Sequence, residues 1–527
     1  MSPALAQEWL YTVRPGDNIW LISEFYLRDT SFWRALQKLN AIADPLHLLP
    51  GEKLRIPVAW LKIQPVPVRI IATAGDVSAL RAPQNDPRPV STDDLLYAGD
   101  EIRTGADGSI TVEFADGSRL FLASNSRLVF DLLSAFGQSG MVDSRMRLEY
   151  GRNQSTVRPV LDAGSRYETW TPAGISAVRG TEFRTSVAEG GRRMNTEVLR
   201  GTVELSAHGS TVKLATGFGA RTEQGQQPGR AVRLLPPPKL VDIPAVEERV
   251  PIRLQVEPVD GAAAYRLEIA PTAAFTSLLF DRVYPTAVFG GIDLDDGAAV
   301  LRVRAIDALG LEGYTSTHDL VVDARPEPPL LMLPQQEGMI FDGKPVFQWT
   351  EPDGAVSYHF QLAASDDFAE PLLDNAALTT AGYVPPQTLA PGTYFWRVAV
   401  TDRSTEKGPF SDVQRFRVPP PGPVAEPPES DGDKLLFRWP EGAPGERYRF
   451  QVATNRAFDA PIVDVVVDEP RAEMPLPDYG TYYLRVLTLD DQGGVLRQGA
   501  VQEINLSPPW YWLLFIPAGA VMFALLL

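Results

Sequence analysis

The side chains that could carry out catalysis are few in this sequence, and they lie far apart. The four histidines, His47, His208, His318 and His359, belong to four different segments of the chain. Their spacing does not match that of metal ligands, and no serine nucleophile elbow or phosphate-binding loop accompanies them. The chain has no cysteine, which excludes disulfides, thiolate nucleophiles and cysteine-ligated metals. We therefore expect neither an enzyme nor a bound cofactor or metal.

Acidic clusters are the other residues that could bind a cation or act in acid–base catalysis. The segment DLDDG (Asp293–Gly297) has the spacing of part of a calcium loop, but the later glutamate of such a loop is missing. The pairs Asp93–Asp94 and Asp366–Asp367 lie in loop-like stretches without recognisable partner residues. These patterns indicate solvated turns.

A candidate binding site lies near the N-terminus, in the segment YTVRPGDNIW (Tyr11–Trp20). The segment predicts a short strand, a sharp Pro-Gly turn and the start of an apolar helix. Gly16 would turn the chain, and Asp17 or Asn18 would cap the helix. The same turn would present backbone amides and an asparagine side chain to a polar ligand.

The residues that follow predict a small unit that would hold this turn in place. Apolar residues recur at helical spacing in two segments, and LLPGEKLRIP (Leu48–Pro57) then gives a second Pro-Gly turn and a second strand. The predicted order is strand, helix, helix, strand, and the two strands can pair. The apolar positions are Ile19, Ile22, Phe25 and Tyr26 in the first helix and Trp33, Leu36 and Leu39 in the second.

This βααβ unit resembles a LysM domain over Tyr11–Pro57, in the pieces YTVRPGD, LNAIADP (Leu39–Pro45) and LPGEKLRIP. Its central segment, Glu24–Leu36, is longer and more aromatic than the simplest form of the family. The resemblance implies binding of glycans that contain N-acetylglucosamine, above all peptidoglycan and chitin. Amides would bond the acetamido groups, and apolar residues would cover the N-acetyl methyl group. Carried over position by position, the glycan-binding residues would be Gly16, Asp17, Asn18, Ile42, Ala43, Leu48, Leu49 and Pro50.

The middle of the chain predicts a β-rich domain. The segment Gly105–Phe130 places Asp-Gly pairs at Asp107–Gly108 and Asp116–Gly117 between alternating strands, which predicts two hairpin turns. A further segment, AVRGTEF (Ala177–Phe183), predicts a strand with a glycine bend. Arg179 would have a structural role beside Glu182, and a binding role for Arg179 is the alternative.

This β-rich part resembles the FecR domain of bacterial envelopes. The resemblance rests on LLYAGDEIRTG (Leu95–Gly105), AVRGTEF and VLRGTVELS (Val198–Ser206). In the iron-responsive regulators of that family, the domain is periplasmic and follows a cytoplasmic anti-sigma segment and a membrane helix. Neither comes before it in this sequence, so we do not expect regulation of a sigma factor.

Three later segments are copies of one another, with a repeat of about 90 residues. Each has alternating apolar and polar residues, as half-buried strands require. Trp349 and Trp439 are predicted to point inward in the second and third copies, and Leu254–Pro258 replaces that strand in the first. The copies resemble fibronectin type III or related immunoglobulin-like sandwiches, which implies spacers or binding surfaces. The matching segments are Tyr265–Phe275, Tyr358–Phe368 and Tyr448–Phe458, followed by Gly297–Asp307, Gly392–Asp402 and Gly480–Asp490.

Four proline-rich runs mark the boundaries between these parts, because such runs form semi-rigid spacers. The runs are Gln64–Val68, Leu235–Lys239, Arg325–Pro329 and Val418–Pro428. The predicted domains are 7–62 (LysM-like), 68–235 (FecR-like), 240–325, 326–420 and 427–507 (three β-sandwich repeats), and 509–527 (transmembrane helix).

The two ends of the chain predict its location. Ala4-Leu5-Ala6 before Gln7 matches a signal peptidase site, which we interpret as part of a longer signal peptide. The nineteen uncharged residues Pro509–Leu527 can just cross a bilayer, and aromatic residues mark their start. We therefore expect a periplasmic protein anchored to the inner membrane by a C-terminal helix. If the N-terminus is genuine, a cytoplasmic tail-anchored protein is the alternative.

The composition excludes nucleic acid as the main partner. The formal net charge is −17, and the sequence has no basic stripe. The predicted fold is multidomain and mainly β, and the predicted function is a non-catalytic cell-envelope protein. It would bind peptidoglycan or another N-acetylglucosamine-containing glycan, and its β-modules would serve as spacers or as a docking surface for an envelope protein. The alternative function is a periplasmic sensor or signalling component whose FecR-like domain responds to a partner.

Overall fold

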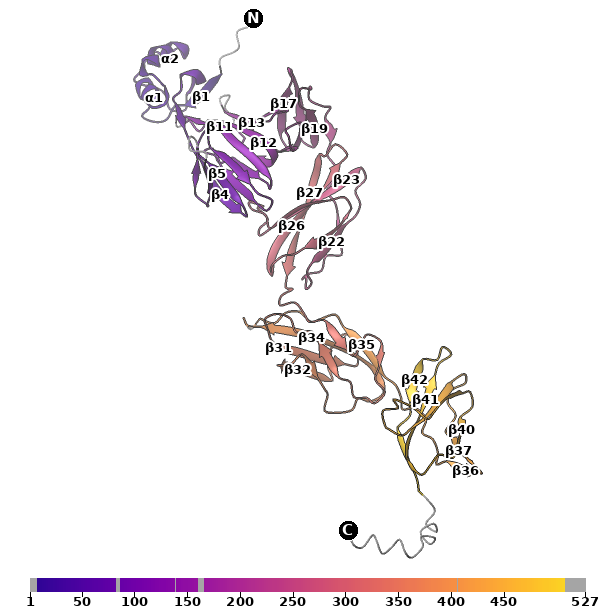
Figure 1. Ribbon diagram of the computed structural model, residues 1–527. Coiled ribbons are helices and arrows are strands. Elements are labelled where there is room, and N and C mark those ends of the chain that lie inside the picture. Colours follow the sequence, from indigo (N-terminus) through magenta and orange to yellow (C-terminus); the bar gives the residue numbers. More distant parts are fainter. Residues whose placement is uncertain (1–6, 82–85, 138, 160–164, 405, 508–527) are drawn as a thin grey trace, which may run out of the picture. The chain divides into compact units, whose positions relative to one another are not determined.

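The computed structural model describes residues 7–81, 86–137, 139–159, 165–404 and 406–507. It divides into two compact units, Met1–Asp323 and Ala324–Leu527. Strands dominate both units, and the described residues contain two short α-helices, both in the first unit (Figure 1). The predicted multidomain, mainly β fold is therefore confirmed.

The predicted transmembrane helix, 509–527, lies outside the described residues. Within the part of the chain that the structure does describe, no helix has the length and apolar character needed to cross a membrane.

The N-terminal element order is the predicted strand, helix, helix, strand. Strand β1 (Glu8–Thr12) pairs antiparallel with β2 (Lys53–Pro57), with Tyr11 opposite Leu54. The elements between them are α1 (Ile19–Tyr26), the 3-10 turn η1 (Thr30–Phe32) and α2 (Trp33–Leu39). The turn η2 (Val58–Trp60) follows β2.

The buried face of α1 differs from the predicted face at one position. Ile19, Ile22 and Tyr26 are buried, but the side chain of Phe25 is 55% exposed. At 100° per residue, Phe25 lies well away from the line through the other three, and Ser23 occupies the buried position instead. The prediction that Phe25 belongs to the apolar face was therefore wrong.

The FecR-like part consists of two hydrogen-bonded sheets that share one long strand, β12 (Val142–Thr156). Residues 142–150 of β12 pair with β11 and β13, whereas residues 151–156 pair with β10 and β15. The change of sheet occurs at Gly151, which has a φ of 98°. A Cβ there would lie 2.1 Å from Ser126 Oγ, so only glycine fits this close approach.

The strands of the first sheet are β3 (Ile63–Pro65), β5 (Val77–Leu80), β6 (Pro87–Pro89), β8 (Glu101–Thr104), β11 (Ser126–Phe136), β13 (Arg166–Trp170), β14 (Ile175–Val178), β17 (Thr202–Ala207) and β18 (Ser210–Ala215). Those of the second are β4 (Val68–Ala74), β7 (Leu95–Leu96), β9 (Ser109–Glu113), β10 (Arg119–Leu122), β15 (Glu182–Val187), β16 (Arg193–Arg200), β19 (Phe218–Glu223) and β20 (Val232–Arg233).

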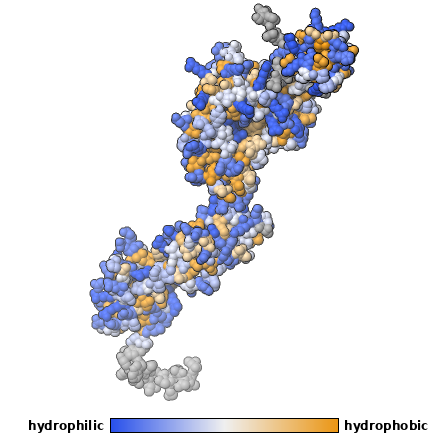
Figure 2. Space-filling model, turned by 180° about the vertical axis from the view of Figure 1, so that it is seen from behind, coloured by the Kyte–Doolittle hydropathy of each residue, from blue (hydrophilic) through white to orange (hydrophobic). Residues whose placement is uncertain are grey.

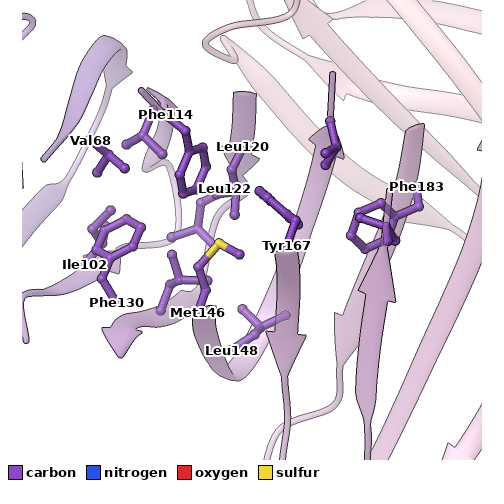
Figure 3. Close-up of a cluster of buried hydrophobic side chains, with 14 of the residues drawn as sticks. Val68, Ile102, Phe114, Leu120, Leu122, Phe130, Met146, Leu148, Tyr167 and Phe183 are labelled. Atoms are coloured by element: carbon purple, nitrogen blue, oxygen red, sulfur yellow. The ribbon is translucent and has the colours of Figure 1, made fainter. Parts of the chain in front are cut away.

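Apolar side chains from both sheets meet in one core. Phe114, Phe130, Met146 and Tyr167 lie side by side in it, with Phe183 at one side (Figure 3). Buried aromatic pairs such as Phe114 and Tyr167, with ring centroids 5.2 Å apart, add to the stabilisation by burial.

One of the two predicted Asp-Gly hairpins is correct. Strands β9 and β10 pair antiparallel across Asp116–Gly117, where Gly117 has a φ of 79°. Asp107–Gly108 does not form a hairpin, because β8 pairs with β5 and β11 while β9 pairs with β4 and β10. A Cβ on Gly108 would lie 2.1 Å from the Asp76 carbonyl oxygen, so this glycine permits close packing of two loops.

Each of the three repeats contains two antiparallel or mixed sheets. Rings from both sheets meet in the core, as Phe347 and Phe360 do with centroids 4.7 Å apart. In the first repeat the sheets are β21 (Leu240–Val241), β22 (Ile252–Val256) and β25 (Val288–Ile292), and β24 (Phe280–Tyr284), β23 (Ala262–Ala270), β26 (Gly297–Asp307) and β27 (Glu312–Val322).

In the second repeat the sheets are β28 (Leu331–Leu333), β30 (Phe347–Trp349) and β33 (Gly382–Tyr383), and β29 (Gly338–Met339), β35 (Gln414–Val418), β34 (Gly392–Asp402), β31 (Ala355–Ala363) and β32 (Leu373–Leu378). In the third they are β36 (Glu429–Asp431), β37 (Lys434–Arg438) and β40 (Arg471–Pro475), and β39 (Val463–Val467), β38 (Arg447–Ala453), β41 (Gly480–Leu489), β42 (Val495–Gln498) and β43 (Gln502–Leu506).

A shared arginine–phenylalanine contact identifies the same face in all three repeats. The guanidinium carbon of Arg302 lies 4.1 Å from the Phe275 ring centroid. The corresponding pairs are Arg397 with Phe368 at 4.1 Å and Arg485 with Phe458 at 4.2 Å. All three phenylalanines are buried and have positive φ angles.

In the first unit, this face of the first repeat is joined to the FecR-like part by a buried ionic cluster. Arg152 of β12 donates to Glu268 at 2.7 Å and to Asp281 at 2.6 Å. Arg184 of β15 donates to the backbone carbonyl of Glu312 at 2.6 Å. The proline run Leu235–Lys239 therefore does not separate two independent modules here.

Glu197, whose carboxylate lies 3.7 Å from the Arg184 guanidinium, makes part of this cluster sensitive to pH. Burial raises the pKa of Glu197 to about 7, although the nearby charge of Arg184 opposes the shift. The unfolded carboxyl has a pKa of about 4.3. A carboxyl whose pKa is higher in the folded state binds protons preferentially there, so its contribution to stability falls as pH rises from about 4.3 to about 7.

We expect Glu197→Gln to stabilise the protein more at pH 8 than at pH 5, by a difference on the order of 2 kcal/mol. The neutral amide removes the cost of an ionised carboxylate that is present only at the higher pH. Thermal unfolding of Glu197→Gln and of the unaltered chain, each at pH 5 and at pH 8, measures this difference. Equal changes in the unfolding temperature at pH 5 and pH 8 would contradict the assignment.

Candidate functional site

The first loop of the predicted glycan site is held by its own polar residues. The Asn18 side chain accepts a hydrogen bond from Leu21 N–H at 2.8 Å and caps α1. The Asp17 carboxylate accepts hydrogen bonds from Arg14 N–H at 2.7 Å and from the Tyr11 hydroxyl. Burial and the bond to Asp17 raise the pKa of Tyr11 above its usual range. Asp17 and Asn18 therefore fix the shape of the turn.

Gly16 lies at the tip of this loop and is exposed. Its φ of 90° is in the left-handed region, and a Cβ there would have no atom within 4 Å. The glycine is therefore required for the backbone conformation, while the space around it is open to a ligand.

The second loop precedes β2 and contains the other predicted residues. The Gln37 side chain donates to the Ile42 carbonyl at 3.0 Å, and the Asp44 carboxylate accepts from Leu46 N–H at 2.9 Å. Ala43 and Pro50 are exposed, and Leu49 is 74% exposed. An apolar side chain as exposed as Leu49 gains nothing from the protein core and is available for contact with a ligand.

Leu48 occupies a different environment from its neighbour. It is 8% exposed and belongs to the apolar core that also contains Ile19 and Leu54. The alternation along this loop thus turns Leu48 inward and Leu49 outward. Any role of Leu48 in binding would be to support the loop.

The two loops lie next to each other. Ile19 N–H, at the start of α1, donates to the Pro45 carbonyl in the second loop at 3.0 Å. Val13 N–H donates to the Glu52 carbonyl at 2.8 Å, and Gly51 N–H donates to the Val13 carbonyl at 2.9 Å. The structure therefore brings Gly16 and Leu49, which are far apart in sequence, onto neighbouring exposed turns.

Two exposed aromatic residues of α1 were not among the predicted site residues. Trp20 and Phe25 of α1 are both about half exposed. The Trp20 ring contacts that of Trp33, with centroids 6.3 Å apart. Trp20 comes two residues after the helix cap, Asn18, and lies on the opposite side of α1 from the buried Ile19 and Ile22. This spacing in the sequence could have identified Trp20 as exposed.

The AVRGTEF segment forms the predicted strand, glycine bend and strand. Strands β14 and β15 flank Gly180, which has a φ of 73°, and a Cβ there would lie 2.5 Å from Pro159 Cα. Glu182 accepts a hydrogen bond from the Gln154 side chain at 3.2 Å. The glycine is therefore explained by the fold.

The described residues contain no group of three or more His, Cys, Asp or Glu side chains arranged to hold a metal ion. His47 pairs with Asp44 at 2.8 Å, and His359 pairs with Asp374 at 2.5 Å. Each of these pairs lies at the surface of its own module.

Two parts of the chain match known protein families. Residues 11–57 match the LysM domain, and residues 100–204 match the FecR protein family. Both resemblances inferred from the sequence are confirmed.

A curated relative matches a much shorter segment. An uncharacterized protein of Deinococcus radiodurans is 42% identical over 48 residues, which is 9% of this chain and 19% of that protein. The chain therefore matches less than a fifth of this relative's length.

Among solved structures, the chain is similar to a putative anti-sigma factor from Parabacteroides distasonis. The identity is 18% and the TM-score 0.21, and the match covers 25% of this chain and 58% of that one. It is also similar to the FN1–FN3 domains of chicken CNTN1, with 14% identity, a TM-score of 0.20, and coverage of 52% and 99%.

Proposed function

We propose that this chain is a non-catalytic cell-envelope protein that binds peptidoglycan, or another glycan containing N-acetylglucosamine, through residues 11–57. The observation that carries the proposal is the pair of neighbouring loops, with Gly16 exposed on one and Leu49 exposed on the other, in a segment that matches the LysM domain. Open backbone beside an exposed apolar side chain suits an acetamido group and its methyl.

The β-modules at 68–235, 240–325, 326–420 and 427–507 would act as spacers or as a docking surface for an envelope protein. The face shown in Figure 2 mixes hydrophilic and hydrophobic residues, as is usual for soluble surfaces. The segment 509–527 would anchor the protein in the inner membrane, with the remainder in the periplasm.

Substitution of Leu49 tests the glycan site. We expect Leu49→Asp to reduce co-sedimentation with insoluble peptidoglycan by about tenfold or more, because a hydrated carboxylate would replace the apolar contact. Binding of the unaltered chain should depend only weakly on salt, since the predicted site carries little charge.

Leu330→Asp provides the matched control, because Leu330 is also 74% exposed and lies in the second repeat. This variant should bind as the unaltered chain does. Equal loss of binding in both variants, or no binding of the unaltered chain at any salt concentration, would refute the glycan proposal.

A reporter fusion tests the proposed location. Alkaline phosphatase fused after Ser507 in the full-length gene should be active, and green fluorescent protein at the same place should be dark. The reverse pattern would place these modules in the cytoplasm, away from peptidoglycan.

A periplasmic signalling component is the second candidate. The match of residues 100–204 to the FecR protein family favours it. In that case the FecR-like part would respond to a partner, and the LysM-like part would place it at the cell wall.

A further inference from the structure

A large cleft lies within the first unit, where the FecR-like part meets the first repeat. Its volume is about 1030 Å³, at the upper end of the range for small-molecule sites. One wall comes from β12, β16 and β19, and the other from β23, β24 and β27; most of these strands are labelled in Figure 1. Most of the lining side chains are polar or charged.

The floor of the cleft is rigid because its charged groups are paired. Arg266 donates to Asp281 at 2.6 Å and to Glu312 at 2.7 Å. Arg152 donates to the same aspartate and to Glu268. These guanidinium groups are held in place by charge-assisted hydrogen bonds, which are the strongest available to arginine.

Two arginines on the wall of the cleft are not paired in this way. Arg193 and Arg221 form no ion pair within 4 Å in the part of the chain that the structure describes. Arg221 donates through Nε to the Asn195 side-chain oxygen at 3.3 Å, and Asn195 in turn donates to the Gly310 carbonyl at 2.8 Å. Arg221 is therefore oriented by a neutral side chain and not by a carboxylate.

The register of β16 and β19 places these two arginines on one face. Arg193 lies opposite Glu223, and Asn195 lies opposite Arg221. Residues two apart on a strand share a face, so the two guanidinium groups are diagonal neighbours that long side chains can bring together. The fork of donors on each guanidinium matches a carboxylate.

The local charge balance is positive although the chain is acidic. Together with Glu223 opposite Arg193, the lining of the cleft and the buried cluster beneath it contain seven arginines and six carboxylates, whereas the whole chain has a net charge of −17. The arginines are Arg152, Arg184, Arg193, Arg221, Arg266, Arg302 and Arg304, and the carboxylates are Glu189, Glu197, Glu223, Glu268, Asp281 and Glu312.

We propose that this cleft binds a small hydrophilic carboxylate, about the size of one or two sugar units, with its anionic group between Arg193 and Arg221. Ser124, Asn125 and Ser186 also line the cleft and provide hydrogen-bonding groups for hydroxyl or amide substituents. This site is separate from the loops proposed to bind glycan.

A pair of related sugars tests the proposal on the full chain. N-acetylmuramic acid carries a carboxylate that N-acetylglucosamine lacks, so the two probes differ in the group that the arginines would recognise. Titration calorimetry in a Leu49→Asp background removes the contribution of the LysM-like loops. We expect N-acetylmuramic acid to bind about tenfold or more tightly than N-acetylglucosamine.

Arg193→Gln and Arg221→Gln should each weaken the binding of N-acetylmuramic acid by about tenfold or more, without changing the unfolding temperature. Arg200→Gln is the matched control, because Arg200 is an exposed residue of the same strand that does not line the cleft. The proposal is overturned if N-acetylmuramic acid does not bind in the millimolar range, or if it binds equally to all three variants. Loss of peptidoglycan binding in Leu49→Asp concerns the LysM-like loops. It does not affect the measured binding of N-acetylmuramic acid to the cleft.

Discussion

Glu268→Gln is expected to destabilise the first unit by about 3–5 kcal/mol, because it removes a buried negative charge that three arginines share. Glu268 is 0% exposed, and its carboxylate accepts hydrogen bonds from Arg152, Arg302 and Arg304. Burial acts to raise the pKa of Glu268, but the charges of these arginines outweigh it and hold the pKa well below its usual range. Its stabilising contribution is therefore present above the unfolded pKa of about 4.3 and is lost as pH falls through the folded pKa.

The second repeat offers a matched control, because Gln361 occupies the corresponding position. Its side-chain oxygen accepts from Arg397 at 2.9 Å, and its amide donates to Asp374 at 3.2 Å. Gln361→Ala should cost less, about 1.5–3 kcal/mol, the usual range for hydrogen bonds to charged groups, because it removes no charge. Chemical denaturation at neutral pH measures both changes. Equal losses in the two variants would show that the charge of Glu268 has no special role.

Truncation of Trp349 to alanine is expected to cost about 3–5 kcal/mol of the stability of the second repeat. Trp349 is 3% exposed and contacts Tyr358 and Phe360, with ring centroids 5.5 Å and 6.0 Å away. Its indole N–H is buried and has no hydrogen-bond partner, so the loss would come from packing alone. The predicted inward orientation of Trp349 and Trp439 is confirmed.

Trp349→Phe is the control for this prediction. It keeps an aromatic ring in the core and removes the unpaired N–H, so it should cost clearly less than the alanine substitution. Denaturant unfolding followed by the fluorescence of the remaining tryptophans can separate the two variants. A loss below about 1 kcal/mol for Trp349→Ala would contradict its place in the core.

Local sequence signals predicted the elements whose stability depends on neighbouring residues. The Pro-Gly turn, the Asn18 cap and the β1–β2 pair follow from residues close together, and the structure contains them. The repeated spacing from Tyr358 to Phe368 likewise reflects one strand and the turn after it. These features need no knowledge of distant partners.

Features that depend on distant residues could not be predicted. Arg152 and Glu268 are 116 residues apart, and their individual environments in the sequence give no sign of a shared buried cluster. The wrong hairpin at Asp107–Gly108 has the same origin, since the turn packs against Asp76 and its flanking strands join different sheets. In the candidate site, the outward direction of Leu49 and the inward direction of Leu48 are set by how the loop packs on the core.

The most direct test of the proposed glycan binding is hydrogen–deuterium exchange of the chain with and without a soluble N-acetylglucosamine oligosaccharide. We expect slower amide exchange in the segments 13–18 and 41–50 when the oligosaccharide is present, because both loops would contact it. The repeats between residues 240 and 507 should exchange at the same rate in both samples. Unchanged exchange in both loops at saturating oligosaccharide, or protection confined to the β-modules, would contradict the account.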